Sequence, residues 1–279
     1  YTVSEPSKTQ KFLYKTVPGR CLLKVLTTPK VSELGGRIVS SRPSRLVIPR
    51  FVKKHEIDLE ECVTTNFASF NDFFTRELRE GARTIPKEKD LLISPCDAHL
   101  TIHPIDKTSV FSIKNSTYTV SELLGGDETL ARRYEGGSCC VFRLTPKQYH
   151  RYCYIDDGVK GGNRRIRGVL HTVHPIAGSR YRVYATNSRE FSVLHTRSFG
   201  KVVQMEVGAL MVGKICNYHE QHAFSRGEEK GRFEFGGSTI VLLFEKDSVV
   251  FDPSIVAASQ KGHEVLVHLG DPIGRACPQ

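Results

Sequence analysis

The chain has no uninterrupted apolar stretch close to the roughly 18 residues that a membrane-spanning helix requires. It does not open with the charged segment and apolar core of a secretory signal peptide. Its eight cysteines form no Cys-x-x-Cys pair and no regular framework, and a chain of 279 residues can build a core without disulfides. These absences argue against a transmembrane protein and a disulfide scaffold, and they predict reduced thiols in a cytosolic protein.

Acidic residues are outnumbered in this chain. The 30 Asp and Glu residues stand against 40 Lys and Arg residues, which gives a formal net charge of +10 and an isoelectric point near 9.2. A basic protein favours a polyanionic neighbour, either nucleic acid or an anionic membrane surface. Apolar residues make up 39% of the chain and charged residues 25%, which is ordinary for a folded protein of one large or two small domains.

Residues 8–57 have the pattern of short cationic helices. Apolar residues recur at helical spacing among lysines and arginines, and Pro18, Pro29, Pro43 and Pro49 stand where separate helices would begin. Such helices suit a membrane interface, where apolar side chains insert and basic side chains bind anionic lipid. Packing on the rest of the protein, with a solvated basic face, explains the same pattern. We predict a helical, membrane-associating region over 1–60 and leave the packing alternative open.

Residues 61–279 are predicted to form a β-rich catalytic domain. A capped helix is expected over Ser69–Gly81, and from Leu91 onward only 119–134 has a helical pattern. Short apolar or alternating runs between turn residues predict the strands. These are Leu91–Ser94, Leu100–His103, Val110–Ile113, Cys139–Leu144, Val169–Val173, Tyr181–Tyr184, Val202–Val207, Ile240–Phe244, Val249–Phe251 and Glu264–Leu269. The predicted fold class is α+β, mainly β: an antiparallel β sandwich or barrel-like core preceded by short N-terminal amphipathic helices.

The segment Gly236-Gly-Ser-Thr239 carries the most reactive arrangement in the chain and is predicted to form a turn between two β-type runs. Glycine relaxes the backbone there, so the Ser238 hydroxyl can swing back to the carbonyl of Gly237. An N→O acyl shift would break the chain, and elimination would convert Ser238 into a pyruvoyl group. Taken alone, the four residues are explained more simply as a Gly-rich hairpin turn with local hydrogen bonds.

Other reactive residues stand at distant positions. Asp97 follows a proline turn, where aspartate commonly accepts local hydrogen bonds, and His150 lies among tyrosines in a pattern typical of a packed histidine. His171 and His174 are three residues apart, which points them to opposite faces of a strand. An Asp, a His and a Ser can form an orienting group, a base and a nucleophile, although a chain of this size contains such a trio by chance.

Six segments resemble, in the same order, the signature motifs of the phosphatidylserine decarboxylases. They are Phe70–Arg83, Ser94–Asp97, Tyr149–Arg151, Phe199–Gly213, Arg226–Gly231 and Phe235-Gly-Gly-Ser-Thr239. The last of them matches the family's self-cleavage site. The matches run from Phe70 to about Phe251, and the helical N-terminus is also similar to that of the family.

The resemblance implies a pyruvoyl-dependent decarboxylase that is made as a proenzyme and cleaves itself between Gly237 and Ser238. Cleavage gives a β chain, 1–237, and an α chain, 238–279, which begins with the pyruvoyl group formed from Ser238, the expected covalent cofactor. Asp97 and His150 match the family's aspartate and first motif histidine, so His150 is expected to deprotonate Ser238 and Asp97 to orient the imidazole. The pyruvoyl group supplies the electron sink, so no metal or further cofactor is expected.

Three positions depart from the family pattern. Cys153 stands where the family often has a second histidine, which leaves open how its role is divided with His150. Ala98 follows Asp97 in place of the usual glycine, and Gly236 replaces a commoner leucine beside the cleavage site. Cys153 and His174 are accessory candidates, and His171 is a candidate pocket residue.

The implied function is decarboxylation of phosphatidylserine to phosphatidylethanolamine by a peripheral protein at the cytoplasmic face of a membrane. The expected partners are anionic phospholipid, phosphatidylserine, the α and β chains of one precursor and a second copy in a homodimer, but not nucleic acid. Three alternatives stay open: a pyruvoyl-dependent decarboxylase of a soluble amino acid, a non-enzymatic basic relative that binds lipid or nucleic acid, and a zinc enzyme. The zinc alternative would use His150, Cys153, His171 and His174, whose spacing fits known zinc sites poorly.

Overall fold

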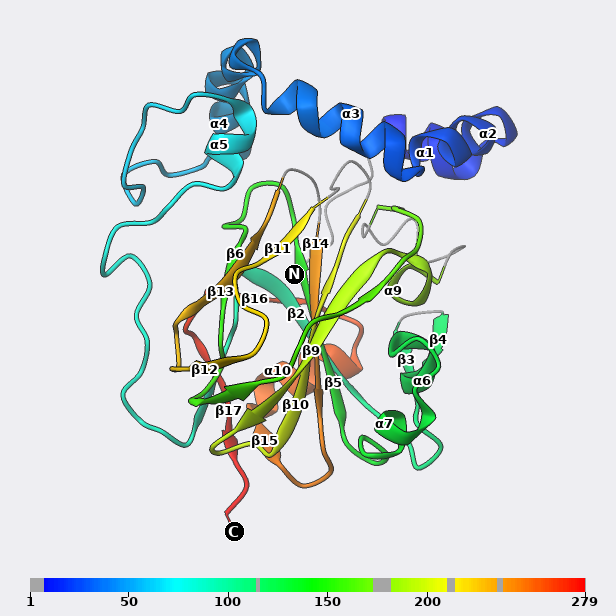
Figure 1. Cartoon of the computed structure of the whole chain (residues 1–279), viewed down its shortest axis with the longest axis vertical. Helices are drawn as coiled ribbons and strands as arrows, with labels where there is room; N and C mark the ends of the chain where they lie inside the picture. The colour runs from blue at the N-terminus through cyan, green and yellow to red at the C-terminus, as the bar shows by residue number, and fades with distance from the viewer. Residues whose placement is uncertain (1–7, 114–115, 173–181, 210–213, 235–237, 279) are drawn as a thin grey trace.

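The computed structural model describes residues 8–113, 116–172, 182–209, 214–234 and 238–278. Short helices come first and lie across one end of a β-rich body (Figure 1). They are α1 (Lys8–Lys15), α2 (Val17–Leu26), α3 (Pro29–Val39), the 3-10 helix η1 (Arg42–Val47) and α4 (Ile48–His55). Pro29, Pro43 and Pro49 each lie in a first turn, as predicted, because a missing N–H is not needed there. Within the described residues, no helix is long and apolar enough to cross a bilayer.

These N-terminal helices pack on the body with one part of their surface and leave another part open. The Thr172 main-chain N–H donates to the Tyr14 hydroxyl at 3.0 Å, and the Leu170 N–H donates to the Thr27 carbonyl at 3.2 Å. Of the 13 exposed large hydrophobic side chains among the described residues, seven belong to this region: Phe12, Val17, Leu22, Leu34, Ile38, Leu46 and Val47. Packing therefore accounts for some of the amphipathic pattern, and an apolar surface remains exposed among basic residues.

The next helix is shorter than predicted. α5 spans Phe70–Phe74 and begins at the predicted cap, where Ser69 Oγ accepts the Asp72 N–H at 3.1 Å. It does not continue to Gly81, because the chain extends instead into an antiparallel bridge at Leu78. The aromatic side chains of α5 are buried in a small cluster with α4 and Phe67.

The named strands pair only in antiparallel fashion and form one large sheet and three small ones. The large sheet has the order β12-β7-β9-β10-β14-β5-β2-β16, with β8 paired to β9. Its strands are β2 (Ala98–Pro104), β5 (Ser138–Leu144), β7 (Gly158–Lys160), β8 (Arg164–Ile166), β9 (Arg189–Thr196), β10 (Lys201–Val207), β12 (His222–Phe224), β14 (Ser238–Phe244) and β16 (Val265–Val267). In the described part of the chain β12 and β16 do not pair with each other, so the sheet is curved without closing into a barrel.

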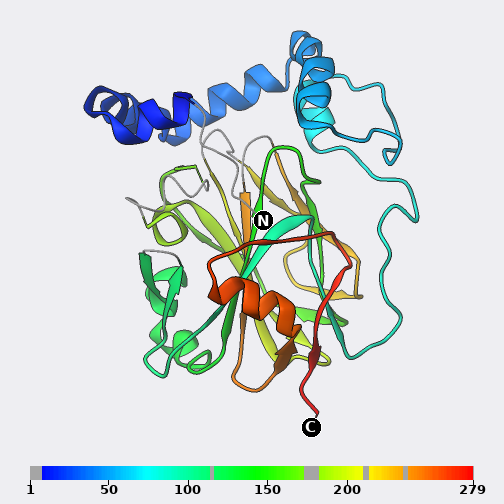
Figure 2. The same cartoon turned by 180° about the vertical axis from the view of Figure 1, so that it is seen from behind.

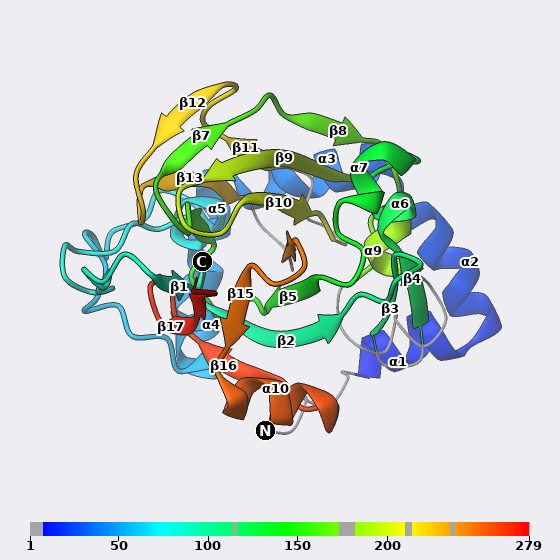
Figure 3. The same cartoon turned by 90° about the horizontal axis from the view of Figure 1, so that it is seen from below.

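The small sheets complete the body. They contain β1 (Leu91–Ile93), β17 (Pro272–Ala276) and β15 (Val249–Phe251) in the first, β11 (Ile215–Asn217), β13 (Glu229–Phe233) and β6 (Arg151–Cys153) in the second, and β3 (Val110–Ile113) and β4 (Ser116–Thr119) in the third. Figure 3 shows the curve of the large sheet from below, with β9 and β10 on one side, β2 and β16 on the other, and β1, β15 and β17 between them.

Two of the predicted strands are wrong. In place of a strand over Tyr181–Tyr184 the described residues form α9 (Val183–Thr186), a single turn closed by the Asn187 N–H on the Val183 carbonyl. Residues 169–172 of the predicted strand Val169–Val173 carry only an isolated bridge, because most of their N–H groups donate outside any strand: to the Thr27 carbonyl, the Asn187 side chain and the Tyr14 hydroxyl. The other eight predicted strands coincide with strands of the structure.

Helices in the second half also differ from the expectation. The segment 119–134 forms two short helices, α6 (Val120–Leu123) and α7 (Glu128–Arg132), because Gly125 and Gly126 between them both have positive φ. A third helix, α10 (Pro253–Gln260), was not predicted and covers the back of the large sheet (Figure 2). Its signal was present in the sequence, since Asp252 accepts the Ser254 N–H at 2.8 Å and a proline follows it in the first turn.

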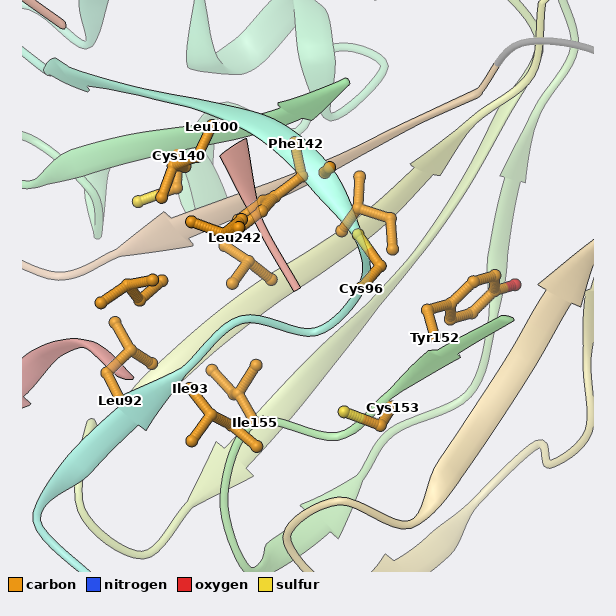
Figure 4. Packing of buried hydrophobic residues seen from close by; sticks show 14 of the residues in the cluster. Leu92, Ile93, Cys96, Leu100, Cys140, Phe142, Tyr152, Cys153, Ile155 and Leu242 are labelled. Carbon is orange, nitrogen blue, oxygen red and sulfur yellow. The ribbon is translucent and has the colours of Figure 1, made fainter. Parts of the chain in front are cut away.

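The central strand of the large sheet, β14, is buried along its whole length. Its alternate side chains enter two cores: Ile240, Leu242 and Phe244 pack on one face, and Val241 and Leu243 on the other. Figure 4 shows part of the first core, in which Leu242 lies with side chains from β1, β2 and β5. A strand covered on both faces needs no polar alternation, which explains its continuous apolar run.

A buried ion pair holds β13 against β10. Lys230 Nζ donates to Glu206 Oε1 and to Asn217 Oδ1, both at 2.7 Å, and neither charged side chain is exposed. Asn217 Nδ2 in turn donates to Glu206 Oε2 at 3.1 Å. Complete hydrogen bonding is what makes a buried pair tolerable, and here it fixes the strand that precedes the predicted cleavage site.

Candidate active site

The site residues meet where several strands end. Ser238 is the first residue of β14 and pairs with Leu144, the last residue of β5. Asp97 directly precedes β2, which pairs with β5 on its other side. Ser238 and Thr239 are therefore strand residues rather than part of the predicted turn, and Asp97 lies at the same end of the sheet.

Two main-chain hydrogen bonds bring β6 to this end. The Cys153 N–H donates to the Pro95 carbonyl, and the Phe233 N–H donates to the His150 carbonyl, both at 2.9 Å. Figure 4 shows Cys153 on β6 and Cys96 on the neighbouring segment, at the border of the first core. The segments that carry Asp97, His150, Cys153 and Ser238 are thus joined at one end of the sheet, close to α5.

Ser238 is fully buried and its hydroxyl is unsatisfied. Among the described residues Oγ has no hydrogen-bond partner, although the side chain has no exposed area. A buried hydroxyl without a partner carries a cost of about 1–3 kcal/mol. Its place at the start of β14 puts it on the face of Ile240 and Leu242, which looks into the first core.

His150 is equally buried, and only one of its ring nitrogens is bonded. Nδ1 lies 2.8 Å from the Gln148 carbonyl, and Nε2 has no partner among the described residues. A carbonyl accepts only, so Nδ1 carries the proton and Nε2 carries the lone pair. The ring packs against Phe74, with centroids 3.9 Å apart. Burial, and after it the positive charge of Arg76, lowers the pKa of His150 to about 3. The imidazole is therefore neutral.

Asp97 is held by an arginine. Arg83 Nε donates to Oδ1 at 3.0 Å and Nη2 donates to Oδ2 at 2.6 Å, while the Leu269 N–H donates to Oδ1 at 2.9 Å. Arg83 also reaches Glu61, and its pKa is raised by the two carboxylates in spite of burial. The group that orients the His150 ring through Nδ1 is thus the Gln148 carbonyl, and the hydrogen bonds of the Asp97 carboxylate go to Arg83 and Leu269.

Cys153, the residue in place of a second histidine, is a buried thiol. Burial raises its pKa to about 12, so it is protonated. The side chain is therefore a thiol and not a thiolate. A protonated thiol is a weak hydrogen-bond donor and does not accept a proton.

Several residues of the site were not singled out from the sequence. Arg151 joins three elements, since its nitrogens donate to the Thr75 carbonyl at 2.9 Å, to Glu229 at 2.9 Å and to Glu77 at 3.0 Å. Phe74 and Gln148 fix the His150 ring, and Arg83 holds Asp97. Arg83 and Phe74 lie in the motif that carries the family resemblance, but sequence spacing does not reveal which distant residue each one contacts.

The other residues predicted for the site do not lie in this cluster of described residues. Gly236, Gly237 and His174 lie outside the described residues. His171 is buried beside Asn187, whose side chain accepts its N–H and donates to its carbonyl. Within the described chain, the three side chains with metal-ligand atoms close together are His219, His222 and Glu228, and none of them belongs to the predicted zinc set.

The low pKa of His150 makes a prediction about stability. In a Ser238→Ala background, we expect the free energy of unfolding to fall between pH 6.5 and pH 4.5, because the unfolded chain takes up a proton that the folded His150 does not bind. Relative to His150→Gln, the loss is about 2 kcal/mol. Urea unfolding at each pH measures it. The exposed His263→Gln variant is the control and should retain the parent's slope; equal slopes for parent and His150→Gln would contradict the assignment.

Comparison with known proteins leads to the same family that the sequence motifs resemble. A family model described as phosphatidylserine decarboxylase matches residues 70–275. The chain is 49% identical over 265 residues to phosphatidylserine decarboxylase proenzyme 2 of Clostridium acetobutylicum, covering 95% of this chain and 90% of that protein. It is 41% identical over 259 residues to the phosphatidylserine decarboxylase proenzyme of Clostridium tetani, covering 91% and 87%. The proenzyme of Ruminiclostridium cellulolyticum is 41% identical over 268 residues, with coverages of 94% and 89%.

The family match spans the site from α5 to β17 and therefore includes Asp97, His150, Cys153 and Ser238. The match to the Clostridium acetobutylicum protein covers 95% of the chain and therefore extends into the N-terminal helices. Motifs, site and relatives agree, and the chain belongs to the phosphatidylserine decarboxylase family.

Proposed function

We propose that this chain is a proenzyme that cleaves itself between Gly237 and Ser238 and then decarboxylates phosphatidylserine to phosphatidylethanolamine with a pyruvoyl group at position 238. The observation that carries the proposal is the pair of buried, unsatisfied atoms, Ser238 Oγ and His150 Nε2, on segments joined at one end of the sheet. One is a hydroxyl that can donate a proton and the other a lone pair that can accept it. In a chain of this family, such a pair is suited to start the self-cleavage.

Cleavage in this proposal starts at Ser238. His150 Nε2 takes the Oγ proton, Oγ attacks the carbonyl carbon of Gly237, and the proton passes to the departing amide nitrogen, which leaves an ester. Loss of the α proton of residue 238 expels the Gly237 carboxylate and ends the β chain, 1–237. Water then replaces the nitrogen, which leaves as ammonia, and the α chain, 238–279, begins with pyruvoyl.

The electrostatics of the site suit a slow self-cleavage that each chain undergoes once. A neutral His150 is ready to accept a proton, but burial and the Arg76 charge oppose the imidazolium. Asp97, at the same end of the sheet, supplies a fixed negative charge that is held by Arg83. In the proposal Asp97 supports the charged state of His150 without a direct bond in the uncut chain, and Cys153 remains a neutral neighbour.

The same residues serve the decarboxylation. When formed, the pyruvoyl group supplies an electron sink for the pair of electrons that carbon dioxide leaves behind. Position 238 is buried, so the reacting carbon would lie among the side chains of the first core and away from bulk solvent. His150 Nε2 is the group that can hold and return a proton there. The Gln148 carbonyl accepts the Nδ1 proton and so keeps the ring in the tautomer that leaves the lone pair on Nε2.

The N-terminal helices supply the membrane contact in this proposal. Residues 1–60 would associate with the cytoplasmic face of a membrane through the exposed apolar side chains and the basic residues around them, and 61–279 would hold the catalytic site. Figure 1 shows α1 to α5 along the end of the sheet at which β14 begins. A lipid headgroup would therefore have a short path to Ser238. A homodimer, as the family resemblance implies, belongs to the proposal as well.

The membrane contact can be tested with two exposed residues of the helical region. Ile38 and Leu46 are 61% and 77% exposed. We expect Ile38→Asp with Leu46→Asp to weaken binding to vesicles of anionic phospholipid at least about tenfold, because two apolar side chains no longer insert. Val250→Asp, on β15 at the far end of the sheet and 55% exposed, is the matched control and should bind as the parent does. Equal binding by both variants would remove the helices from the proposed contact.

The substrate can be tested with purified, processed protein. We expect carbon dioxide release from phosphatidylserine in mixed vesicles and none from free serine, with phosphatidylethanolamine as the second product. Ser238→Ala is expected to release nothing, since the nucleophile and the future pyruvoyl carbon are lost. Release from free serine in place of the lipid would instead favour a decarboxylase of soluble amino acids. Protein that binds vesicles but turns over neither compound would point to a non-enzymatic relative.

A further inference from the structure

Arg76 has a buried charge that no carboxylate of the described residues pairs with directly. It follows α5 in the chain and its side chain is 6% exposed. Nη2 donates to the carbonyls of Lys147 at 3.2 Å and Gln148 at 3.4 Å, but Nε and Nη1 have no partner among the described residues. No carboxylate of the described residues lies within 4.0 Å of its guanidinium. An arginine buried without a counter-ion and with free donors is costly, which suggests that a ligand completes it.

Other buried and half-buried arginines show which contacts Arg76 lacks. Arg83 is paired with Asp97 and Arg143 with Glu264, and Arg151 reaches Glu229. Arg189 has no carboxylate, but its three nitrogens donate to four carbonyls, at distances of 2.6 to 3.0 Å. Arg76 alone among these five arginines keeps two nitrogens without an acceptor. Its neighbour Cys62 gives the guanidinium a weak thiol contact but no charge, because burial raises the pKa of that thiol. Asp97 also acts on Arg76, but its carboxylate is already paired with Arg83.

The place of this guanidinium is the candidate active site. Arg76 Nη2 and His150 Nδ1 both donate to the Gln148 carbonyl, which puts the charge beside the imidazole. Arg76 also lies over the Phe73 ring, 5.2 Å from its centroid, while Phe74 packs on His150. It therefore stands where the N-terminal helices meet the end of the sheet, between the proposed membrane surface and position 238.

We propose that Arg76 binds the phosphodiester of the substrate headgroup and so selects a phospholipid over a free amino acid; this inference rests on the proposed function. Phosphatidylserine carries two anions, the phosphodiester and the carboxylate. The carboxylate loses its charge in the reaction, so a buried cation held on it would stabilise the ground state more than the transition state. The phosphodiester keeps its charge throughout, and an arginine is well suited to it. Free serine has no phosphodiester and leaves Arg76 unsatisfied.

The test compares two small substrates on processed enzyme. Glycerophosphoserine carries the amine, the carboxylate and the phosphodiester, whereas O-methylserine carries only the first two. We expect Arg76→Gln to lower kcat/KM for glycerophosphoserine about 100-fold, mostly through KM, because a buried charged contact is lost. The value for O-methylserine, already low, should stay unchanged, and Arg76→Lys should recover part of the loss. Arg189→Gln, the matched buried arginine, is expected to leave the ratio of the two substrates as in the parent.

The outcomes separate this inference from the proposed function. Equal losses on both substrates would assign Arg76 to the carboxylate or to the fold and would overturn the inference. If Arg76→Gln does not mature into two chains, competition on the parent enzyme decides: glycerophosphoethanolamine, which has the phosphodiester without the carboxylate, should inhibit at concentrations where ethanolamine does not. Equal inhibition by both overturns the inference as well. A parent that releases no carbon dioxide from any of these compounds contradicts the proposed function itself.

Discussion

One main-chain carbonyl, that of Gln148, determines the tautomer of His150 and holds Arg76 beside the imidazole. It accepts the His150 Nδ1 proton, which leaves the lone pair on Nε2, and it also accepts from Arg76. A buried neutral base is thus held next to a cation that pairs directly with no carboxylate of the described residues. Both the neutral base and the cation depend on the core that surrounds them. In the proposed chemistry, the aromatic side chains of α5 and the strand β6 are therefore as necessary as the reactive atoms.

The large sheet fixes the position of Ser238. Its central strand is buried on both faces between β10 and β5, so the position of Ser238 is fixed by pairing with Leu144 and by the packing of the apolar residues that follow it. Arg83 then joins Glu61 to Asp97, which precedes β2, and Arg151 on β6 joins the Thr75 carbonyl after α5 to Glu229 on β13. The proposed lipid contact and the proposed cleavage site thereby belong to one packed unit.

The sequence predicted what depends on local pattern and motif order. Apolar runs located β14, β5 and β10, a serine cap located the start of α5, and the motifs located Asp97, His150 and Ser238. It failed where distant contacts decide: Val183–Thr186 became a helical turn, and α5 ended early because the chain after it pairs with the segment around Cys62. The partner of Asp97 is Arg83, 14 residues away along the chain, and this contact is set by tertiary packing, which spacing along the chain does not encode.

The most direct test of the account is the intact mass of the freshly purified wild-type protein under denaturing conditions. The account requires two chains, one ending at Gly237 and one of the 42 residues 238–279, the smaller lighter than a serine-led peptide by the mass of one ammonia molecule. That result would establish cleavage at Ser238 and the pyruvoyl group together. A single uncut chain after long incubation, or a small chain that still begins with serine, would contradict the claim that buried Ser238 and His150 form a self-processing site.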